Sequence, residues 1–274
     1  MSLVLAAATV HFPYMTGWPE RASAEHRSAT TAGFALLGKA FADAGIETIV
    51  AFTSEHIVNL QPRLAPPFLI GVGESHAAFP EPQFNLPPVT RRGDPELAEA
   101  LVRALYAMGF DPAHSSELRL DHGTTLPLAQ MGIAEGVRVV PIIVNSLFPP
   151  LPTLTRCRDL GAAVATALAR STLGRRVALL ATGGISHTVG APGMELNDPG
   201  FDAAFLGALA EADLDHACSY SDALLDASGN GTHEIRNWVA VAGAMHPARP
   251  RVVTDLAYAP GWDSGVHQLL WSAP

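Results

Sequence analysis

The sequence predicts one α/β domain, with a central mixed sheet flanked by helices, over residues 1–274. Two observations support this prediction. Apolar, β-branched runs alternate with amphipathic segments along the whole chain, and no repeat or low-complexity linker divides it. The composition, with 48% hydrophobic and 16% charged residues, is sufficient for one sizeable core.

Expected elements follow from these patterns in chain order. The expected strands are Leu3–Val10, Glu47–Thr53, Phe68–Val72, Val137–Asn145, Arg176–Thr182 and Arg251–Tyr258. The expected helices are Arg27–Ala44, Asp94–Met108, Cys157–Ser171, Asp198–Ala212 and His233–Met245. Asp94 and Asp198 each precede a proline, which indicates an N-cap followed by a proline in the first helical position. Thr232 is the expected N-cap of the last helix, and Pro141 favours an edge position or a bulge for its strand.

The chain from Pro62 to Val89 is rich in proline and mixes glycine, phenylalanine and histidine. A long irregular excursion inside a compact domain is usually functional or mobile. We expect this segment to form a pocket wall or a subunit contact.

Charge and cysteine content exclude several classes of protein. The formal net charge is -9, and the 17 Lys and Arg residues form no cluster, so a nucleic-acid surface is not expected. The two cysteines, Cys157 and Cys218, provide neither a disulfide framework nor a sulfur-based metal site. No apolar run reaches about 18 residues, so no membrane span is expected. The apolar start lacks the basic region of a secretory signal, which predicts a buried first strand and a cytoplasmic protein.

Two histidines follow the first two predicted strands. His11 comes directly after Leu3–Val10, and His56 lies close behind Glu47–Thr53. Open α/β sheets bind ligands at the carboxyl ends of their strands, so two adjacent strands would deliver both imidazoles to one point. Each histidine alone also has an ordinary explanation, a hydrogen bond to the backbone at a strand end.

Glu234 lies just inside the start of the last predicted helix, where a carboxylate commonly stabilises exposed amides. His233 precedes it, but neighbouring helical positions point about 100° apart, so only one of them can face a common site. We assign Glu234 to that site. Two histidines and one carboxylate are the smallest ligand set that holds a ferrous ion and leaves positions open for substrate and oxygen.

Two further histidines lie in contexts that suit proton transfer. His122 is preceded by Asp121, which could orient it, and is followed by a glycine. His187 follows Gly183 and Gly184 at a strand end, where the backbone can approach a ligand closely. The other histidines are expected on the surface or in packing: His26, His76, His114, His216, His246 and His267. The chain has no GxSxG elbow and no phosphate-binding glycine loop.

Taken in order, five segments carry a resemblance: Val10-His11-Phe12-Pro13, Ser54-Glu55-His56, Asp121-His122-Gly123-Thr124, Gly183-Gly184-Ile185-Ser186-His187 and Gly231–Trp238. Together they resemble the class III extradiol dioxygenases, the family of the protocatechuate 4,5-dioxygenase β subunit. The resemblance implies a catalytic subunit of aromatic catabolism, with the metal site at the strand ends. Glu55 departs from the family pattern, in which aspartate often precedes the second ligand histidine.

This resemblance also implies the roles of the site residues. Fe(II) would be held by His11, His56 and Glu234, with His187 as acid/base residue and His122 as a second proton donor; both would contact the substrate. The reaction would insert both atoms of O₂ into a catechol, gallate or 2-aminophenol to give a muconic semialdehyde-type product. The partners would be that aromatic substrate, O₂, and further copies of the chain or a related subunit in an oligomer.

Two alternatives remain open on the sequence. One is a family-related metal-binding subunit that does not cleave rings, and the other is a Zn-dependent hydrolase with the same ligand set. His122 and His187 favour an enzyme, because a purely structural metal site would not need them.

Overall fold

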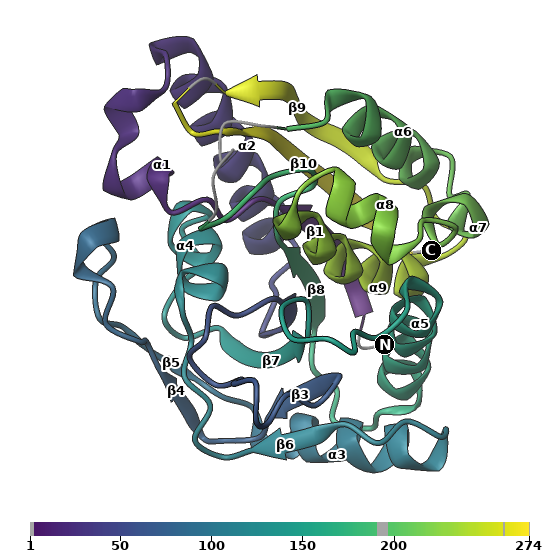
Figure 1. The fold of residues 1–274 in the computed structure, drawn as a ribbon. Helices are drawn as coiled ribbons and strands as arrows, with labels where there is room; N and C mark the ends of the chain where they lie inside the picture. Colours follow the sequence, from purple (N-terminus) through teal and green to yellow (C-terminus); the bar gives the residue numbers. More distant parts are fainter. Residues whose placement is uncertain (1–2, 191–196, 260, 274) are drawn as a thin grey trace.

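A large mixed sheet forms the middle of the molecule in a computed structural model that describes residues 3–190, 197–259 and 261–273 (Figure 1). Its eight strands follow the order β6-β3-β7-β2-β8-β1-β10-β9. Their bounds are β1 (Leu3–Thr9), β2 (Thr48–Thr53), β3 (Phe68–Gly71), β6 (Ala113–Ser115), β7 (Arg138–Val144), β8 (Val177–Thr182), β9 (Arg251–Ala259) and β10 (Ser264–Ser272). A separate two-stranded sheet pairs β4 (Ser75–Ala77) with β5 (Thr90–Arg92). The predicted fold class, one α/β sheet with flanking helices, is confirmed.

Helices cover both faces of the large sheet. The α-helices are α1 (Tyr14–Gly17), α2 (Ala24–Asp43), α3 (Pro95–Ala107), α4 (His122–Gln130), α5 (Leu154–Arg170), α6 (Pro199–Ala210), α7 (Leu214–Ala217), α8 (Asp222–Ala227) and α9 (Ile235–Met245). Short 3-10 turns are η1 (Pro19–Arg21), η2 (Pro82–Phe84) and η3 (Asn230–Glu234). Side chains of α3, α5, α6 and α9 pack on one face, and those of α2 and α4 pack on the other. Figure 1 shows these helices on the two sides of the sheet. Among the described residues, no helix is long and apolar enough to cross a membrane.

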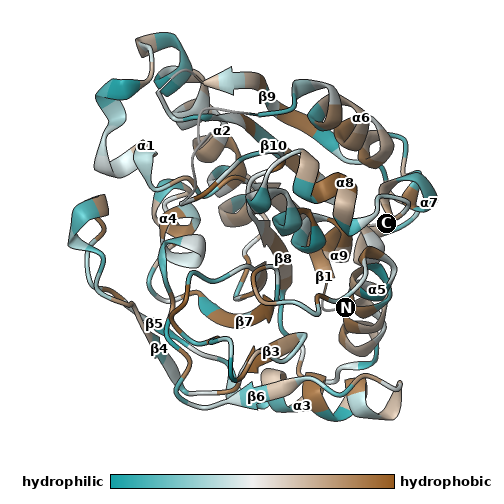
Figure 2. Cartoon of the chain, in the orientation of Figure 1, coloured by the Kyte–Doolittle hydropathy of each residue, from teal (hydrophilic) through white to brown (hydrophobic). Residues whose placement is uncertain are grey.

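Alternation along β1 shows why its sequence is apolar throughout. Ala6 and Ala8 join the core cluster of α5 and α9, while Leu5 and Ala7 join the cluster of α2. A strand covered on both faces has no polar side, so it reads as a continuous apolar run. Figure 2 shows the same pattern as brown strands in the interior of the fold.

Four strands at the centre of the sheet are mutually parallel, in the order β7-β2-β8-β1. Their carboxyl ends therefore meet at one edge, where α/β sheets bind ligands. β10 and β9 continue the sheet beyond β1 as antiparallel strands. β10 was not predicted, because its buried His267 and Gln268 interrupt the apolar pattern.

Pro141 has neither the edge position nor the bulge expected for it, because β7 pairs with β2 through Pro141 without a register shift. β7 lies inside the sheet, between β3 and β2. The antiparallel ladder with β3 ends at the pair Ile70–Ile142, so the residue without an N–H lies just past the last hydrogen-bonded pair. Gly71 leaves room for the proline ring, because a Cβ there would lie 2.6 Å from Cγ of Pro141.

The two helix starts marked by Asp-Pro are as predicted. Asp94 accepts from the N–H of Leu97, and Asp198 accepts from that of Phe201, which are N-caps worth about 1 kcal/mol each. Thr232 is not a cap. It lies in the 3-10 turn η3, and α9 begins only at Ile235. The excursion over 62–89 is also more ordered than expected, since it contains β3, β4 and η2.

Candidate active site

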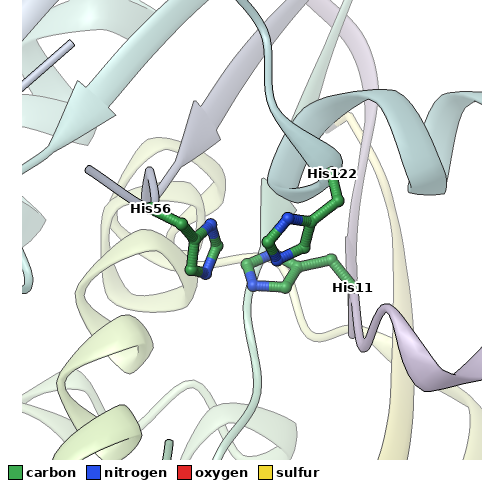
Figure 3. Close-up of side chains that lie close together, drawn as sticks. All are labelled: His11, His56 and His122. Atoms are coloured by element: carbon green, nitrogen blue, oxygen red, sulfur yellow. The ribbon is translucent and has the colours of Figure 1, made fainter. Parts of the chain in front are cut away.

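Three histidines converge at the carboxyl edge of the parallel strands (Figure 3). His11 follows β1, His56 follows β2, and His122 opens α4. One ring nitrogen of each lies within 4.8 Å of the others, a spacing at which a metal ion could be shared. The rings of His56 and His122 stack with centroids 4.0 Å apart, while His11 meets both edge-on.

The expectation that two adjacent strands bring His11 and His56 together is wrong in one respect. β8 lies between β1 and β2. All three strands are parallel and end at the same level, because Thr9 pairs with Thr182 and Phe52 with Ala181. The two imidazoles therefore reach toward each other across the end of β8.

Glu234 completes the cluster from the opposite side. Its Oε1 lies 3.2 Å from Nε2 of His11 and 3.5 Å from Nε2 of His56. Its Oε2 accepts the backbone N–H of Gly184 at 2.7 Å. One carboxylate oxygen is thus fixed by the backbone, while the other faces the two imidazoles.

The start of α9 is tied to the end of β8, which sets the position of Glu234. Asn237 donates to the carbonyl of Thr182 at 2.8 Å, and the indole of Trp238 donates to the carbonyl of Gly183 at 3.1 Å. A Cβ at Gly183 would lie 2.8 Å from that of Glu234, so this glycine makes room for the carboxylate rather than for a ligand.

His233, the alternative to Glu234, is engaged elsewhere. Its Nε2 lies 2.8 Å from Oδ1 of Asp226, and its Nδ1 lies 2.6 Å from Nη1 of Arg236. Arg236 is itself fully buried and binds Asp222. Only the glutamate of this pair faces the three histidines.

Separate carboxylates orient His56 and His122. Asp121 accepts the backbone N–H of His56 at 2.6 Å, and its Oδ2 lies 3.1 Å from Nδ1 of that ring. Glu81 does the same for His122, with 2.6 Å to the N–H and 2.7 Å to Nδ1. The prediction that Asp121 orients His122 is therefore wrong. In both rings a carboxylate on Nδ1 leaves Nε2 with its lone pair free for a metal or a proton.

The ionisation of each group in the cluster depends on the charges of its neighbours. Burial opposes ionisation of Glu234, but His11 and His56 outweigh it and lower the pKa of the carboxyl well below its usual range. Burial likewise opposes the charged form of His56, yet Asp121 and Glu234 raise its pKa well above the usual value. Burial also opposes ionisation of Asp121, but His56 lowers its pKa to about 2. The carboxylates are therefore ionised and favour a cation at this point.

His187 borders the cluster beside Glu234. Its Nε2 lies 3.7 Å from Oε2 of Glu234, and its Nδ1 lies 3.1 Å from the carbonyl of Ile185, to which it donates. Burial lowers its pKa. A Cβ at Gly184 or Gly231 would lie 2.6 or 2.2 Å from ring atoms of His187, so these glycines pack the imidazole in place.

A cavity of about 580 Å³ opens onto all four histidines. Its wall is largely aromatic and includes Phe12, Tyr14, Trp18, Phe79, Phe84 and Trp262. The Pro-rich excursion supplies Phe79, Glu81, Gln83 and Phe84, as expected of a pocket wall. A larger hollow between α3 and β6, of about 700 Å³, lies away from the cluster and is lined by one histidine, His114. We therefore place the candidate active site in the smaller cavity.

Glu81 is a residue of the candidate site that sequence reasoning missed. It lies in an irregular segment between two prolines, where no periodic pattern assigns its direction. Its partner is 41 residues away. The only local signal was a carboxylate inside an otherwise apolar stretch.

Comparison with known proteins identifies the family of this chain. Residues 5–263 match the family described as "Catalytic LigB subunit of aromatic ring-opening dioxygenase". The chain belongs to this family. It is thus an oxygenase of the ring-opening class, as the resemblance implied, and the proposed metal-binding segments all lie inside the matched region.

Three relatives of this oxygenase are named 2,3-dihydroxyphenylpropionate/2,3-dihydroxicinnamic acid 1,2-dioxygenase. The protein from Xanthobacter autotrophicus is 31% identical over 78% of this chain and 82% of its own. That from Dechloromonas aromatica is 29% identical over 88% and 91%. That from Mycolicibacterium smegmatis is 38% identical over 56% of this chain and 47% of its own length. The crystal structure of uncharacterized protein JW3007 from Escherichia coli K12, at 15% identity and TM-score 0.57 over 97% and 99% of the two chains, shares the fold.

Proposed function

We propose that this chain is an Fe(II)-dependent extradiol dioxygenase that cleaves a catechol-, gallate- or 2-aminophenol-type ring. The observation that carries the proposal is the convergence of Oε1 of Glu234 on Nε2 of His11 and His56, at 3.2 and 3.5 Å. Such a donor set, with two imidazoles and one carboxylate, suits a ferrous ion and leaves positions open. Bound iron would supply the site that holds substrate and O₂ together and favours the phenolate form of the substrate.

His122 is a competing ligand, because its ring nitrogen lies within 4.8 Å of those of His11 and His56. We nevertheless assign the third position to Glu234. Oε1 of the carboxylate lies 3.2 and 3.5 Å from Nε2 of the two imidazoles, and this oxygen has no backbone partner, unlike Oε2. A carboxylate also neutralises part of the charge of a divalent cation, which a third imidazole does not.

Proton handling falls to His187 and His122. Because Nδ1 of His187 donates to the carbonyl of Ile185, its Nε2 is free to accept a proton from a substrate hydroxyl. The carboxylate of Glu81 fixes His122 in the same tautomer, so that its Nε2 faces the cluster as a second proton-transfer group and substrate contact. The aromatic side chains of the cavity wall place apolar surface beside these transfers.

The balanced reaction takes one substrate ring and one O₂. A ring C–C bond next to a hydroxyl-bearing carbon breaks, both oxygen atoms enter the product, and no external reductant is consumed. Cleavage creates one carboxylate and one aldehyde or ketone, and the second ring substituent, a hydroxyl or an amino group, stays on the opened chain. A catechol therefore gives a muconic semialdehyde-type compound.

Oxygen uptake by anaerobically prepared, Fe(II)-loaded protein tests the function. We expect uptake with at least one member of a panel containing protocatechuate, gallate, 2-aminophenol and alkyl catechols, together with a yellow product. The same protein loaded with Zn²⁺ should consume no oxygen. Uptake with no member of the panel would favour a binding subunit, and hydrolysis by the zinc form would favour the hydrolase alternative.

Subunit composition and compartment stay predictions. All proposed ligands come from one chain, so the metal centre itself needs no second subunit. We propose a homo-oligomer, or a hetero-oligomer with a related subunit, in the cytoplasm. Sedimentation of the purified chain tests the first part.

A further inference from the structure

We infer that the cavity selects aromatic substrates whose ring carries an uncharged, apolar substituent rather than a carboxylate. This inference rests on the proposed function and narrows its substrate class. It is carried by the charge of the cavity wall, not by the metal cluster.

No lysine or arginine lines the cavity among the residues that the structure describes. The segments outside the description, residues 1–2, 191–196, 260 and 274, contain no lysine or arginine in their sequence either. The wall does hold two acidic side chains beyond the metal cluster, Glu81 and Asp263. A substrate carboxylate would therefore lose its hydration without meeting a lysine or arginine side chain.

Glu81 cannot turn away to relieve the repulsion, because its two oxygens bind the ring and the backbone of His122. Asp263 lies on the turn between β9 and β10, a segment separate from the excursion that carries Glu81. Negative charge thus enters the wall from two separate segments. A bound divalent cation would attract an anion, but the carboxylate of Glu234 and the ionised hydroxyl of the substrate already offset that charge.

Aromatic side chains form a continuous path outward from the metal cluster. Phe84 meets His122 with centroids 5.1 Å apart, Trp18 meets Phe84 at 6.2 Å, and Tyr14 meets Trp18 at 5.6 Å. A volume of about 580 Å³ is within the roughly 300–1,000 Å³ of drug-sized ligand sites, which leaves room beyond one ring. An alkyl or aryl substituent would replace water along this path and gain the free energy of apolar burial.

Arg21 is a cation that contacts this path from outside the lining. Its guanidinium carbon lies 5.5 Å from the Tyr14 centroid and 5.3 Å from the Trp18 centroid. Contacts of this kind are favourable cation–π interactions. Arg21 therefore stabilises the aromatic wall. Substitution of Arg21 tests whether it also binds an anionic substituent of the substrate.

The decisive experiment compares an acid with its isosteric amide. Binding of 3-(2,3-dihydroxyphenyl)propionate and 3-(2,3-dihydroxyphenyl)propionamide is followed anaerobically by the fluorescence of Trp18 and Trp262, both of which line the cavity. We expect the amide, and 3-propylcatechol, to bind at least about tenfold more tightly than the acid, which corresponds to 1.4 kcal/mol. The ratio of kcat/KM should follow the same order. Equal or tighter binding of the acid would overturn the inference.

Failure of the proposed function would look different. In that case the amide and 3-propylcatechol would bind without oxygen uptake, or none of the three compounds would bind. Preference for the acid with normal ring cleavage would leave the function intact and contradict only the substrate class.

Charge variants at the cavity mouth sharpen the test. Gln83 is exposed and lines the cavity, so Gln83→Arg should raise the affinity for the acid about tenfold relative to the amide, while Gln83→Met should not change the ratio. Asp263→Asn should also raise the affinity for the acid relative to the amide. Asparagine tolerates the positive φ of 56° at this position. A selective loss of acid binding in Arg21→Gln would show that Arg21 serves the anion and would contradict the inference.

Discussion

Glu81 binds His122 at two points, its backbone N–H at 2.6 Å and its ring Nδ1 at 2.7 Å. The contact joins the Pro-rich excursion to the start of α4. It fixes both the rotamer and the tautomer of a histidine that borders the candidate metal centre. Glu81 therefore positions a side chain of the candidate site, although it comes from an irregular segment.

Glu81→Gln tests this positioning. A glutamine can accept a hydrogen bond from the ring, but its NH₂ group then faces the backbone N–H of His122, so one of the two contacts is lost. We expect kcat to fall about tenfold, within the range of outer-shell substitutions, while KM and iron content change little. Steady-state kinetics and metal analysis measure these quantities. Glu74→Gln, at an exposed position on the same excursion, is the matched control. Iron loss comparable to that of His11→Ala would instead mean that His122 holds the metal.

Ligand identity is tested by iron binding in four variants. His11→Ala, His56→Ala and Glu234→Ala should each weaken Fe(II) binding by more than about 100-fold, the upper end of outer-shell effects. His122→Ala should keep nearly one iron per chain. Anaerobic titration gives the affinities, and circular dichroism verifies that each variant is folded. If Glu234→Ala retained iron and His122→Ala lost it, the three-histidine set would replace the proposed one.

Gly231→Ala tests the role of His187 without changing a polar group. The added Cβ would lie 2.2 Å from Nε2 of His187, so the ring must move. We expect turnover to fall at least about tenfold with iron retained, because general acid–base transfer contributes about 10²–10⁴-fold. Gly207→Ala is the control, since no atom lies within 4 Å of its Cβ position. Normal turnover in Gly231→Ala would remove His187 from proton transfer.

Stability should depend on pH through His76, a buried residue away from the cluster. Burial lowers the pKa of its ring, whose Nδ1 lies 3.1 Å from the carbonyl of Leu118. The folded state therefore holds it neutral, while the unfolded chain protonates it below about pH 6.5. Below about pH 6.5 the unfolded state binds more protons than the folded state, so the free energy of unfolding falls as the pH drops. Above this pH, His76 does not change the free energy of unfolding. In His76→Asn, which keeps a donor for Leu118, urea unfolding should show a weaker loss of stability between pH 7 and pH 5. An identical pH dependence in both proteins would contradict this.

Sequence reasoning succeeded where the signal was local. His11 and His56 follow strongly apolar strands, and strand ends have a known direction in a parallel sheet. It was less successful for long-range pairing. Asp121 is adjacent to His122 in sequence. As the N-cap of α4, however, its carboxylate accepts the N–H of Gly123 and that of His56. Adjacency along the chain does not fix where a capping side chain points.

Longer-range features gave no sequence signal at all. Glu81 meets its partner across 41 residues, from a segment without periodicity. The place of β8 between β1 and β2 depends on the order of the sheet, which alternation of apolar runs does not specify. The burial of Pro141 inside the sheet depends on Gly71 in a neighbouring strand. Each of these features is set by tertiary packing.

Isotope incorporation tests the central claim most directly. The Fe(II)-loaded protein is given 3-propylcatechol under ¹⁸O₂, and the ring-opened product is analysed by mass spectrometry immediately after formation. A ring-cleaving dioxygenase predicts that one O₂ is consumed per substrate and that both labelled atoms appear in the product. Unlabelled product, a single labelled atom with the other released as water, or no reaction with any catechol of the panel would contradict it.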